Sequence, residues 1–201
     1  MEGYARFRLI WEPDYPFSFA KIRLKGTHIV EGFSEHAAPE KNGLFVDIFP
    51  FDSVLDDPAQ RKKQARAYFF CKRLLWIKKG MGVNMKKGPI QQKLKYYGFW
   101  VLAAMLPYDG VLKCYKKIQT RYNHLKTEKV VTDGSYTYEK ESLFRYWVTD
   151  LMQVDFEGEK FTSFRENEEY LTYFYGDYMQ LPPVEKRNRH QALNVDFGPY
   201  Q

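Results

Sequence analysis

The sequence lacks most features of a secreted or membrane-spanning protein. It has two cysteines in 201 residues, Cys71 and Cys114, which lie in separate segments with helical character. We therefore predict reduced thiols in a cytosolic protein rather than a disulfide framework. The longest apolar run, residues 99–106, is too short for a membrane span, which takes about 20 residues. Residues 1–6 show no basic start followed by an apolar segment, so no signal peptide is predicted.

Metal-binding and nucleic-acid-binding motifs are also missing. His28, His36 and His124 have no metal-ligand spacing relative to one another. Asp14 is the only aspartate that precedes Asp47, so there is no acidic cluster upstream of that residue. The net charge of +6 favours an anionic partner, such as a nucleotide or a membrane surface, although basic proteins are also common for reasons of solubility. Because no RNA or DNA motif is present, no nucleic acid is expected as a partner.

What the sequence does contain is a short apolar segment with one acid inside it. Residues 43–52, GLFVDIFPFD, predict a fully buried strand that Pro50 ends. Alternation along a strand places Asp47 on the same face as Phe45 and Phe49. A carboxylate buried alone is costly, so we expect a cation, a cluster of donors or a bound metal beside it. The alternative is an aspartate that caps a neighbouring loop through hydrogen bonds.

Turn and helix signals divide the rest of the chain. Asp57 and Pro58 begin a long helix in which basic and aromatic residues are interleaved, and Gly80 ends it. The other expected elements are a helix over 1–11, a hairpin of strands 19–24 and 27–30, helices over 89–105, 108–125 and 165–175, a hairpin of 151–156 and 160–164, and an irregular tail from 176. Strands, then helices, then strands indicate the α+β class.

Three segments occur in an order that is typical of one family: residues 19–27 (FAKIRLKGT), 43–52 (GLFVDIFPFD) and 175–183 (YGDYMQLPP), the last followed by Glu185, Arg187 and His190. They resemble the LicD family of phosphocholine transferases, relatives of the fukutin-type sugar phosphotransferases. The resemblance implies a nucleotidyltransferase-like mixed sheet with a helical insertion of about three helices. It also implies a single LicD-like domain over residues 1–201. We expect that domain to be N-terminally incomplete, because the family's Asp-Asp-Asp-Ile-Asp type of motif has no counterpart here.

The resemblance implies a phosphotransferase reaction. Phosphocholine, or a similar phospho-substituent, would pass from a CDP-linked donor to a sugar hydroxyl of a cell-surface glycan or lipopolysaccharide precursor. Mg²⁺ or Mn²⁺ would neutralise charge on the phosphates and align the nucleophile with the leaving group. Asp47 matches an acid of the family and is the expected catalytic metal ligand. Asp52 matches the same segment and is a second candidate ligand, with a helix or turn cap as its structural alternative.

Basic residues are candidates for binding the phosphates of the donor. Lys21 and Arg23 match a Lys-x-Arg pair of the family, and a fixed pair of cations on one strand face suits nucleotide phosphates. The alternative is two solvated positions on an exposed strand face. Arg187 and His190, near the C-terminus, are further phosphate-binding candidates.

The segment after the last predicted helix is a candidate for the head group of the substrate. Asp177 and Tyr178 offer a carboxylate and an aromatic face, which suit a quaternary ammonium ion such as choline. In the structural alternative, Gly176 ends the helix in a left-handed conformation and the tail packs its aromatic residues on the core.

Two other functions stay open. The missing acidic motif is also expected of a catalytically inactive remnant that binds only a nucleotide or a partner chain. The basic and aromatic helix predicts a membrane-surface module with contacts at Lys72, Arg73, Lys78 and Lys79, or else an amphipathic helix with its aromatic residues on the core. For the transferase we expect a CDP-choline-like donor, a glycan acceptor that is free or lipid-linked, and a cytoplasmic location with peripheral contact at the inner membrane face.

Overall fold

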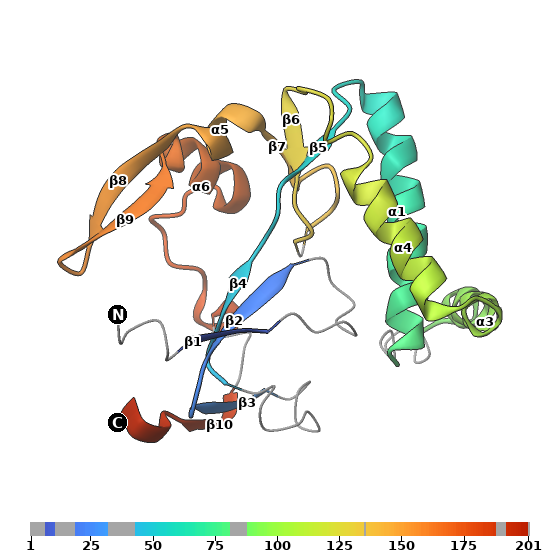
Figure 1. The fold of residues 1–201 in the computed structure, drawn as a ribbon, viewed down its shortest axis with the longest axis horizontal. Coiled ribbons are helices and arrows are strands. Elements are labelled where there is room, and N and C mark those ends of the chain that lie inside the picture. Colours follow the sequence, from blue (N-terminus) through green and yellow to red (C-terminus); the bar gives the residue numbers. More distant parts are fainter. Residues whose placement is uncertain are drawn as a thin grey trace. The chain divides into compact units, whose positions relative to one another are not determined.

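The computed structural model describes residues 7–10, 19–31, 43–80, 88–134, 136–187 and 192–200 (Figure 1). The chain divides into two compact units. Unit 1 contains the described residues 7–10, 19–31, 43–49, 171–187 and 192–200, and unit 2 contains 50–80, 88–134 and 136–170. The chain combines small sheets with helices, which confirms the predicted α+β class.

Unit 1 is built on two small sheets. One contains β1 (Phe7–Ile10), β2 (Ala20–Leu24) and β4 (Phe45–Ile48), with β2 in the centre. The other pairs β3 (His28–Glu31) with β10 (Ala192–Asp196). Two short 3-10 helices, η3 (Val184–Lys186) and η4 (Gly198–Tyr200), flank β10 in the sequence. All these strand pairs are antiparallel.

Pairing between distant segments overturns three predictions in unit 1. The hairpin of residues 19–24 and 27–30 is wrong, because β1 and β4 take both edges of β2 and β3 pairs with β10 instead. The turn itself is present, with Gly26 at a φ of 80°. Within the predicted helix over residues 1–11, the described part is strand β1. The predicted irregular tail from residue 176 contains β10 and the two 3-10 helices.

The predicted buried strand is shorter and more exposed than expected. β4 ends at Ile48 and lies at an edge of its sheet, and Val46, on the opposite face from Phe45 and Asp47, is 64% exposed. The predicted alternation holds, because Phe45 and Asp47 are both half-buried while Val46 and Ile48 are exposed. Within residues 43–52 the buried positions are Gly43 and Asp52, and Asp52 is the first residue of the fully buried strand β5 (Asp52–Val54) of unit 2.

In the sequence of unit 2, three helices come between two strands that pair with each other. Its elements are β5, α1 (Pro58–Lys78), α3 (Ile90–Met105), α4 (Tyr108–Thr120), β6 (Lys129–Val131), β7 (Ser142–Phe144), α5 (Arg145–Thr149), β8 (Leu151–Phe156), β9 (Glu159–Phe164) and the first part of α6 (Asn167–Tyr175). β5, β6 and β7 form an antiparallel sheet, and β8 pairs with β9. The predicted helical insertion corresponds to α1, α3 and α4, whereas the nucleotidyltransferase-like sheet stays a prediction.

Local sequence signals set the ends of α1. The Asp57 side chain accepts a hydrogen bond of 2.8 Å from the Gln60 amide, and Pro58 is the first helical residue. After the helix, Gly80 adopts a φ of 73°, which favours glycine. The predicted bounds of this helix are confirmed.

The helix α4 ends a turn earlier than predicted. It stops at Thr120 rather than near residue 125 because Asn123 is engaged with β5. The Asn123 side chain accepts from the Ser53 amide at 2.8 Å and donates to Asp52 Oδ1 at 2.7 Å. These tertiary hydrogen bonds compete with continuation of the helix.

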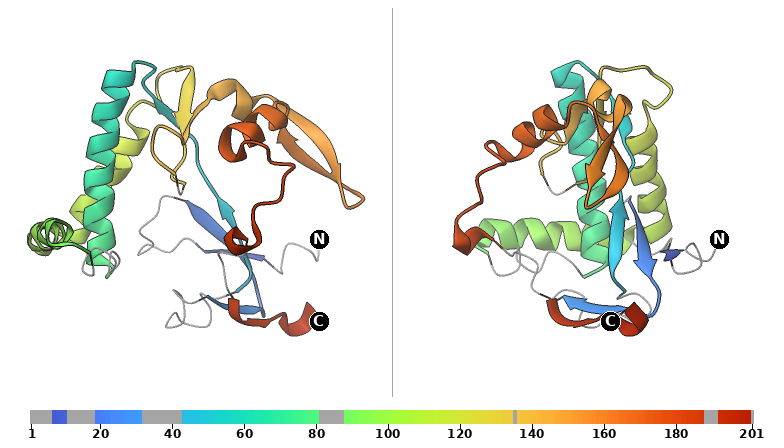
Figure 2. Two further views of the ribbon diagram at one scale, coloured as in Figure 1. Left: turned by 180° about the vertical axis from the view of Figure 1, so that it is seen from behind. Right: turned by 90° about the vertical axis from the view of Figure 1, so that its left-hand side faces the viewer.

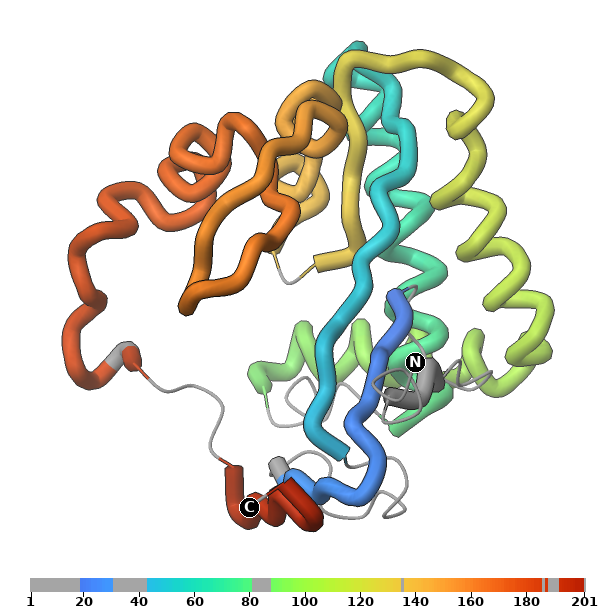
Figure 3. The backbone as a smooth tube through the Cα atoms, turned by 60° about the vertical axis from the view of Figure 1, so that its left-hand side comes forward, coloured from blue at the N-terminus to red at the C-terminus, as the bar shows by residue number. Residues whose placement is uncertain are grey.

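The core of unit 2 lies around α1, α3 and α4. Figures 1 and 2 show α1 beside α4, with α3 crossing near one end of α1, and the tube in Figure 3 follows the same path. The buried core residues are Val54, Tyr68, Cys71, Leu74, Leu75, Ile77, Tyr96, Ala103, Val111, Tyr115, Val131 and Tyr138. Cys71 and Cys114 bring their sulfur atoms to 3.7 Å across α1 and α4 without a disulfide.

Candidate functional site

The candidate site in unit 1 is the polar face of the ladder between β2 and β4. Lys21 stands directly opposite Asp47 in the register, and its Nζ lies 2.8 Å from Asp47 Oδ1. The side chains are 15% and 28% exposed, so the pair lies near the surface and within reach of solvent. The cation that we expected beside the Asp47 carboxylate is therefore supplied by the neighbouring strand.

An aromatic ring supports both cations of this face. Lys21 Nζ lies 3.4 Å from the centroid of the Phe45 ring, and the Arg23 guanidinium carbon lies 5.2 Å from it. Phe19 and Phe49 stack beside them, with ring centroids 4.4 Å apart. Cations over aromatic faces are attracted by the ring quadrupole, so Phe45 helps to fix the two basic side chains on one face.

One side-chain donor of Arg23 has no acceptor among the described residues. Its Nη1 donates to the Gly43 carbonyl at 3.0 Å, which holds the guanidinium across the start of β4. Its Nε is buried and has no hydrogen-bond partner among the residues that the structure describes. A buried N–H without an acceptor is costly to the fold, so this position of Arg23 is not explained by the contacts within unit 1 alone.

The turn between β2 and β3 holds this face in place. Thr27 Oγ1 donates to the Leu24 carbonyl at 2.8 Å and accepts from the Leu44 amide at 2.9 Å. A Cβ at Gly43 would lie 2.9 Å from the Leu24 carbonyl oxygen, closer than real Cβ atoms approach. Gly43 is thus needed for the close approach of the chain ahead of β4, and Thr27 has a structural role.

Asp52 and Asp47 belong to different units. It belongs to β5 of unit 2, is 8% exposed and accepts the hydrogen bond from Asn123. These contacts support its structural alternative as a residue that holds the turn after α4. Its part in a metal site stays a prediction.

The acids do not make a metal site by themselves. Within the described ranges, no three His, Cys, Asp or Glu side chains gather as a divalent ion requires. Asp47 is engaged with Lys21, and Asp52 with Asn123. Among the described residues these two acids alone therefore do not complete a site for Mg²⁺ or Mn²⁺, and we assign no reaction step to a metal.

The other predicted binding residues lie at the C-terminal side of unit 1. Gly176 has a φ of 69° and its amide donates to the Thr172 carbonyl at 2.8 Å, so it caps α6 as the structural alternative predicted. Asp177 is exposed and Tyr178 half-buried directly after this cap. Arg187 Nε donates to the Pro182 carbonyl at 2.6 Å, within its own loop. His190 lies outside the described residues.

The chain has a relative among characterised enzymes. It is 24% identical over 162 residues to the lipopolysaccharide cholinephosphotransferase LicD of Haemophilus influenzae. Over that length the chain is similar to LicD. The similarity covers 77% of this chain and 57% of the length of the LicD protein, so the chain matches little more than half of that relative. No family model and no solved structure gives a significant match.

Unit 2 contains a buried polar cluster that the sequence did not predict. Lys72 and Asp133 form an ion pair with side chains 8% and 1% exposed. The hydroxyls of Tyr68 and Tyr115 also donate to Asp133, the latter at 2.6 Å. Burial opposes ionisation of Asp133, but the charge of Lys72 and these hydrogen bonds outweigh it and hold the Asp133 pKa below its usual value.

This cluster shows that the predicted membrane-contacting surface of α1 is wrong at Lys72. Lys72 was expected to contact a membrane, but its ammonium group is buried against Asp133. The sequence signals were an acid next to a glycine, Asp133-Gly134, and tyrosines on two helices. The Gly134 position is packed so closely that a Cβ there would clash with the Glu141 carboxylate.

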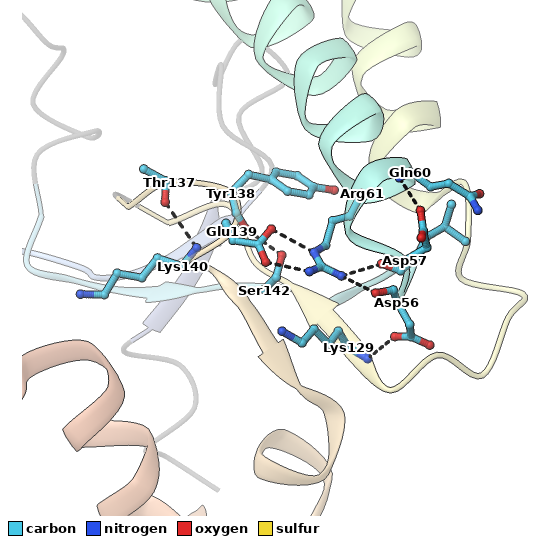
Figure 4. A network of polar contacts seen from close by, with 11 residues as sticks. Asp56, Asp57, Gln60, Arg61, Lys129, Thr137, Tyr138, Glu139, Lys140 and Ser142 are labelled. Carbon is cyan, nitrogen blue, oxygen red and sulfur yellow. Dashed lines mark hydrogen bonds and ion pairs between the residues drawn. The ribbon is translucent and has the colours of Figure 1, made fainter.

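A second ion pair ties the start of α1 to the loop before β7. Arg61 is 3% exposed and donates to both carboxylate oxygens of Glu139, at 3.0 and 2.7 Å (Figure 4). It also donates to the carbonyls of Leu55 and Asp56 at 3.0 and 2.9 Å. The hydrogen bonds from Arg61 lower the Glu139 pKa. Arg61 is thus a structural clamp of unit 2 and not part of an exposed basic surface.

Proposed function

We propose that this chain takes part in the transfer of phosphocholine, or a similar phospho-substituent, from a CDP-linked donor to a sugar hydroxyl of a cell-surface glycan or lipopolysaccharide precursor. The observation that carries the proposal is the face formed by Lys21, Arg23 and Asp47 over Phe45. The LicD relationship supports a transferase function in lipopolysaccharide biosynthesis.

Lys21 and Arg23 are the proposed ligands of the diphosphate. Both are held over Phe45, so little conformational entropy would be lost when an anion binds. The guanidinium of Arg23 adds a second cation to this face, and its planar set of donors suits a phosphate. Lys21 can donate one hydrogen bond to Asp47 and another to the same phosphate, because an ammonium has three donors. In this arrangement Asp47 orients Lys21.

The remaining assignments are extensions of this proposal. Asp177 and Tyr178 are proposed to bind the cationic head group, and Arg187 and His190 to bind phosphate. Mg²⁺ or Mn²⁺ enters the proposal only through the LicD relationship, with Asp47 and Asp52 as the proposed ligands. The acceptor is a glycan, and the chain acts at the cytoplasmic side of the membrane.

A transfer assay tests the proposal. The 201-residue chain is incubated with CDP-choline labelled in the choline moiety, a lipopolysaccharide acceptor and Mg²⁺, and the label in the acceptor is counted. We expect Asp47→Asn to remove most of the transfer. Asp155→Asn is the matched control, because it removes the same charge from a side chain that is 76% exposed on β8. Equal transfer by wild type and Asp47→Asn would contradict the role of this acid.

The inactive remnant is the second candidate, and nucleotide binding separates it from the transferase. Calorimetric titration with CDP-choline, with and without Mg²⁺, measures binding independently of turnover. Binding through Lys21 and Arg23 without any transfer would favour the remnant. If the wild type neither binds CDP-choline nor transfers it, the transferase and the nucleotide-binding form of the remnant are both wrong, and a remnant that binds a partner chain is left.

A further inference from the structure

The helix α3 in unit 2 has an apolar face that contacts solvent. Its exposed large apolar residues are Ile90, Leu94, Tyr97, Trp100, Val101 and Met105. Five of them follow a spacing of four, three, four and four residues, which lies along one face of a helix. Ile90, Leu94 and Met105 are 68%, 66% and 77% exposed, so this face is not partly covered core.

The opposite face of α3 accounts for the core packing of the helix. Tyr96 and Ala103 are 3% and 2% exposed, and Phe99 packs against the same core. The helix is therefore attached to unit 2 by one apolar face and presents a second one outward. A continuous apolar patch of this kind on a protein surface marks an interaction site.

The charges around the patch point to the nature of its partner. The α3 sequence, IQQKLKYYGFWVLAAM, contains Lys93 and Lys95, both exposed, and no acidic residue. At the end of α1 that contacts α3, Arg73 and Lys79 are also exposed. Cations beside an apolar stripe complement an anionic surface with an apolar interior.

Aromatic residues in the stripe point the same way. Tyr97 and Trp100 are 55% and 51% exposed, and such rings favour the boundary between lipid head groups and acyl chains. No helix in the described part of the chain is long and apolar enough to cross a bilayer. An apolar face of four turns with basic flanks suits a helix that lies in the plane of a membrane surface instead.

We infer that α3 is a docking element for an anionic lipid membrane, with its Ile90–Met105 stripe inserted among the lipids and Lys93 and Lys95 at the head groups. This places membrane contact on α3 and not on the α1 surface predicted from the sequence, in which Lys72 is buried. The inference does not rest on the transfer reaction, because it follows from the surface of unit 2 alone.

Vesicle flotation with the full chain tests the inference. The vesicles contain phosphatidylcholine alone or phosphatidylcholine with phosphatidylglycerol, so that charge and apolar insertion are read separately. We expect binding to the anionic vesicles and little binding to the neutral ones. The double variant Leu94→Gln/Val101→Gln should lower the partition coefficient about tenfold, because two inserted apolar side chains are lost.

Two matched controls test whether binding depends on α3 itself or on any exposed apolar or basic residues of the chain. Phe156→Gln/Phe161→Gln removes two exposed apolar residues from the β8–β9 hairpin and should leave binding unchanged. Lys93→Gln/Lys95→Gln should weaken binding and flatten its dependence on salt, whereas Lys113→Gln/Lys117→Gln on α4 should have a smaller effect. Circular dichroism and a melting curve check that every variant is folded.

Three results would overturn the inference. One is failure of the wild type to bind anionic vesicles. Another is an equal loss of binding in the α3 variant and the hairpin variant. The third is a concentration-dependent dimer in analytical ultracentrifugation that Leu94→Gln/Val101→Gln abolishes, without any vesicle binding, because a second copy of the chain would then cover the face. Transfer activity is measured separately, so its loss or presence does not decide among these results.

Discussion

Lys21–Asp47 in unit 1 and Lys72–Asp133 in unit 2 are both lysine–aspartate pairs, and they differ in what surrounds them. In unit 1, Lys21 and Asp47 are 15% and 28% exposed. In unit 2, Lys72 and Asp133 are 8% and 1% exposed, and two tyrosine hydroxyls also donate hydrogen bonds to the carboxylate. The first pair lies on a sheet face that a ligand can reach, and the second is enclosed by the core.

The same two residue types can therefore serve binding or stability, depending on how deeply they are buried. A buried pair that is fully hydrogen-bonded resists change, since removal of either partner leaves an uncompensated charge. A pair near the surface exchanges its partners with water and ligands at small cost. The predictions below test whether unit 2 depends on its pair for stability and unit 1 uses its pair for binding.

The largest expected effect is on the stability of unit 2. Asp133→Ala leaves Lys72 buried without its counter-ion and two tyrosine hydroxyls without their acceptor. We expect the free energy of unfolding to fall by about 3–5 kcal/mol, measured by urea denaturation. The double variant Lys72→Met/Asp133→Asn removes both charges and keeps an acceptor for the hydroxyls, so it should lose much less. A loss as large as in Asp133→Ala would argue against the charge as the cause.

Acidification should affect the same pair. The folded-state pKa of Asp133 is lowered, so the stability that it contributes is present at neutral pH and above the pKa of the unfolded state. That contribution is lost as the pH falls below about 3.9, the ordinary aspartate value, toward the lowered pKa. Unfolding curves at several pH values should show a steeper loss for wild type than for Asp133→Asn. Glu139, whose pKa Arg61 lowers, adds to the slope in both proteins.

In unit 1 the expected effect is on binding. Arg23→Gln removes a guanidinium whose Nε has no acceptor among the described residues, so we expect the affinity for CDP-choline to drop about tenfold. Isothermal titration calorimetry measures the change. Arg23→Lys keeps the charge but not the planar fork, and should recover only part of the affinity. An unchanged dissociation constant for Arg23→Gln would remove this residue from the proposed site.

The smallest expected effect is on the stability of unit 1. Lys21→Met breaks a partly exposed pair with Asp47 while it keeps apolar contact with Phe45. We expect a loss of less than about 1 kcal/mol in the free energy of unfolding, since such pairs contribute little. The affinity for CDP-choline should nevertheless fall. A loss of stability comparable to that of Asp133→Ala would show that the two pairs do not differ as proposed.

Much of the fold follows from signals within a few residues of one another. Asp57, Pro58 and Gly80 predict the ends of α1, because capping and left-handed conformations depend on the local chain. Glu157-Gly158 predicts the β8–β9 hairpin for the same reason. The candidate site was partly predictable too, since alternation puts Asp47 on the half-buried face of β4 and Lys21 on one face with Arg23.

The errors concern partners that lie far away in the sequence. The strand after Gly26 was expected to pair with its neighbour β2. It pairs instead with β10, which lies more than a hundred residues further along the chain. α4 was expected to continue past Thr120, but Asn123 bonds to β5. Local patterns contain no information on which edge of a strand is already occupied.

The sequence by itself determined the class of the fold, the long helices, the face on which Asp47 lies and the similarity to LicD, because these depend on local periodicity and on the order of short segments. Only the tertiary structure decided which charges are buried. Lys72 and Lys79 belong to one basic helix segment, but a side chain is buried or exposed according to what packs against it. Asp133 closes on Lys72 in the core, whereas Lys79 lies beside the Tyr108 ring and remains exposed.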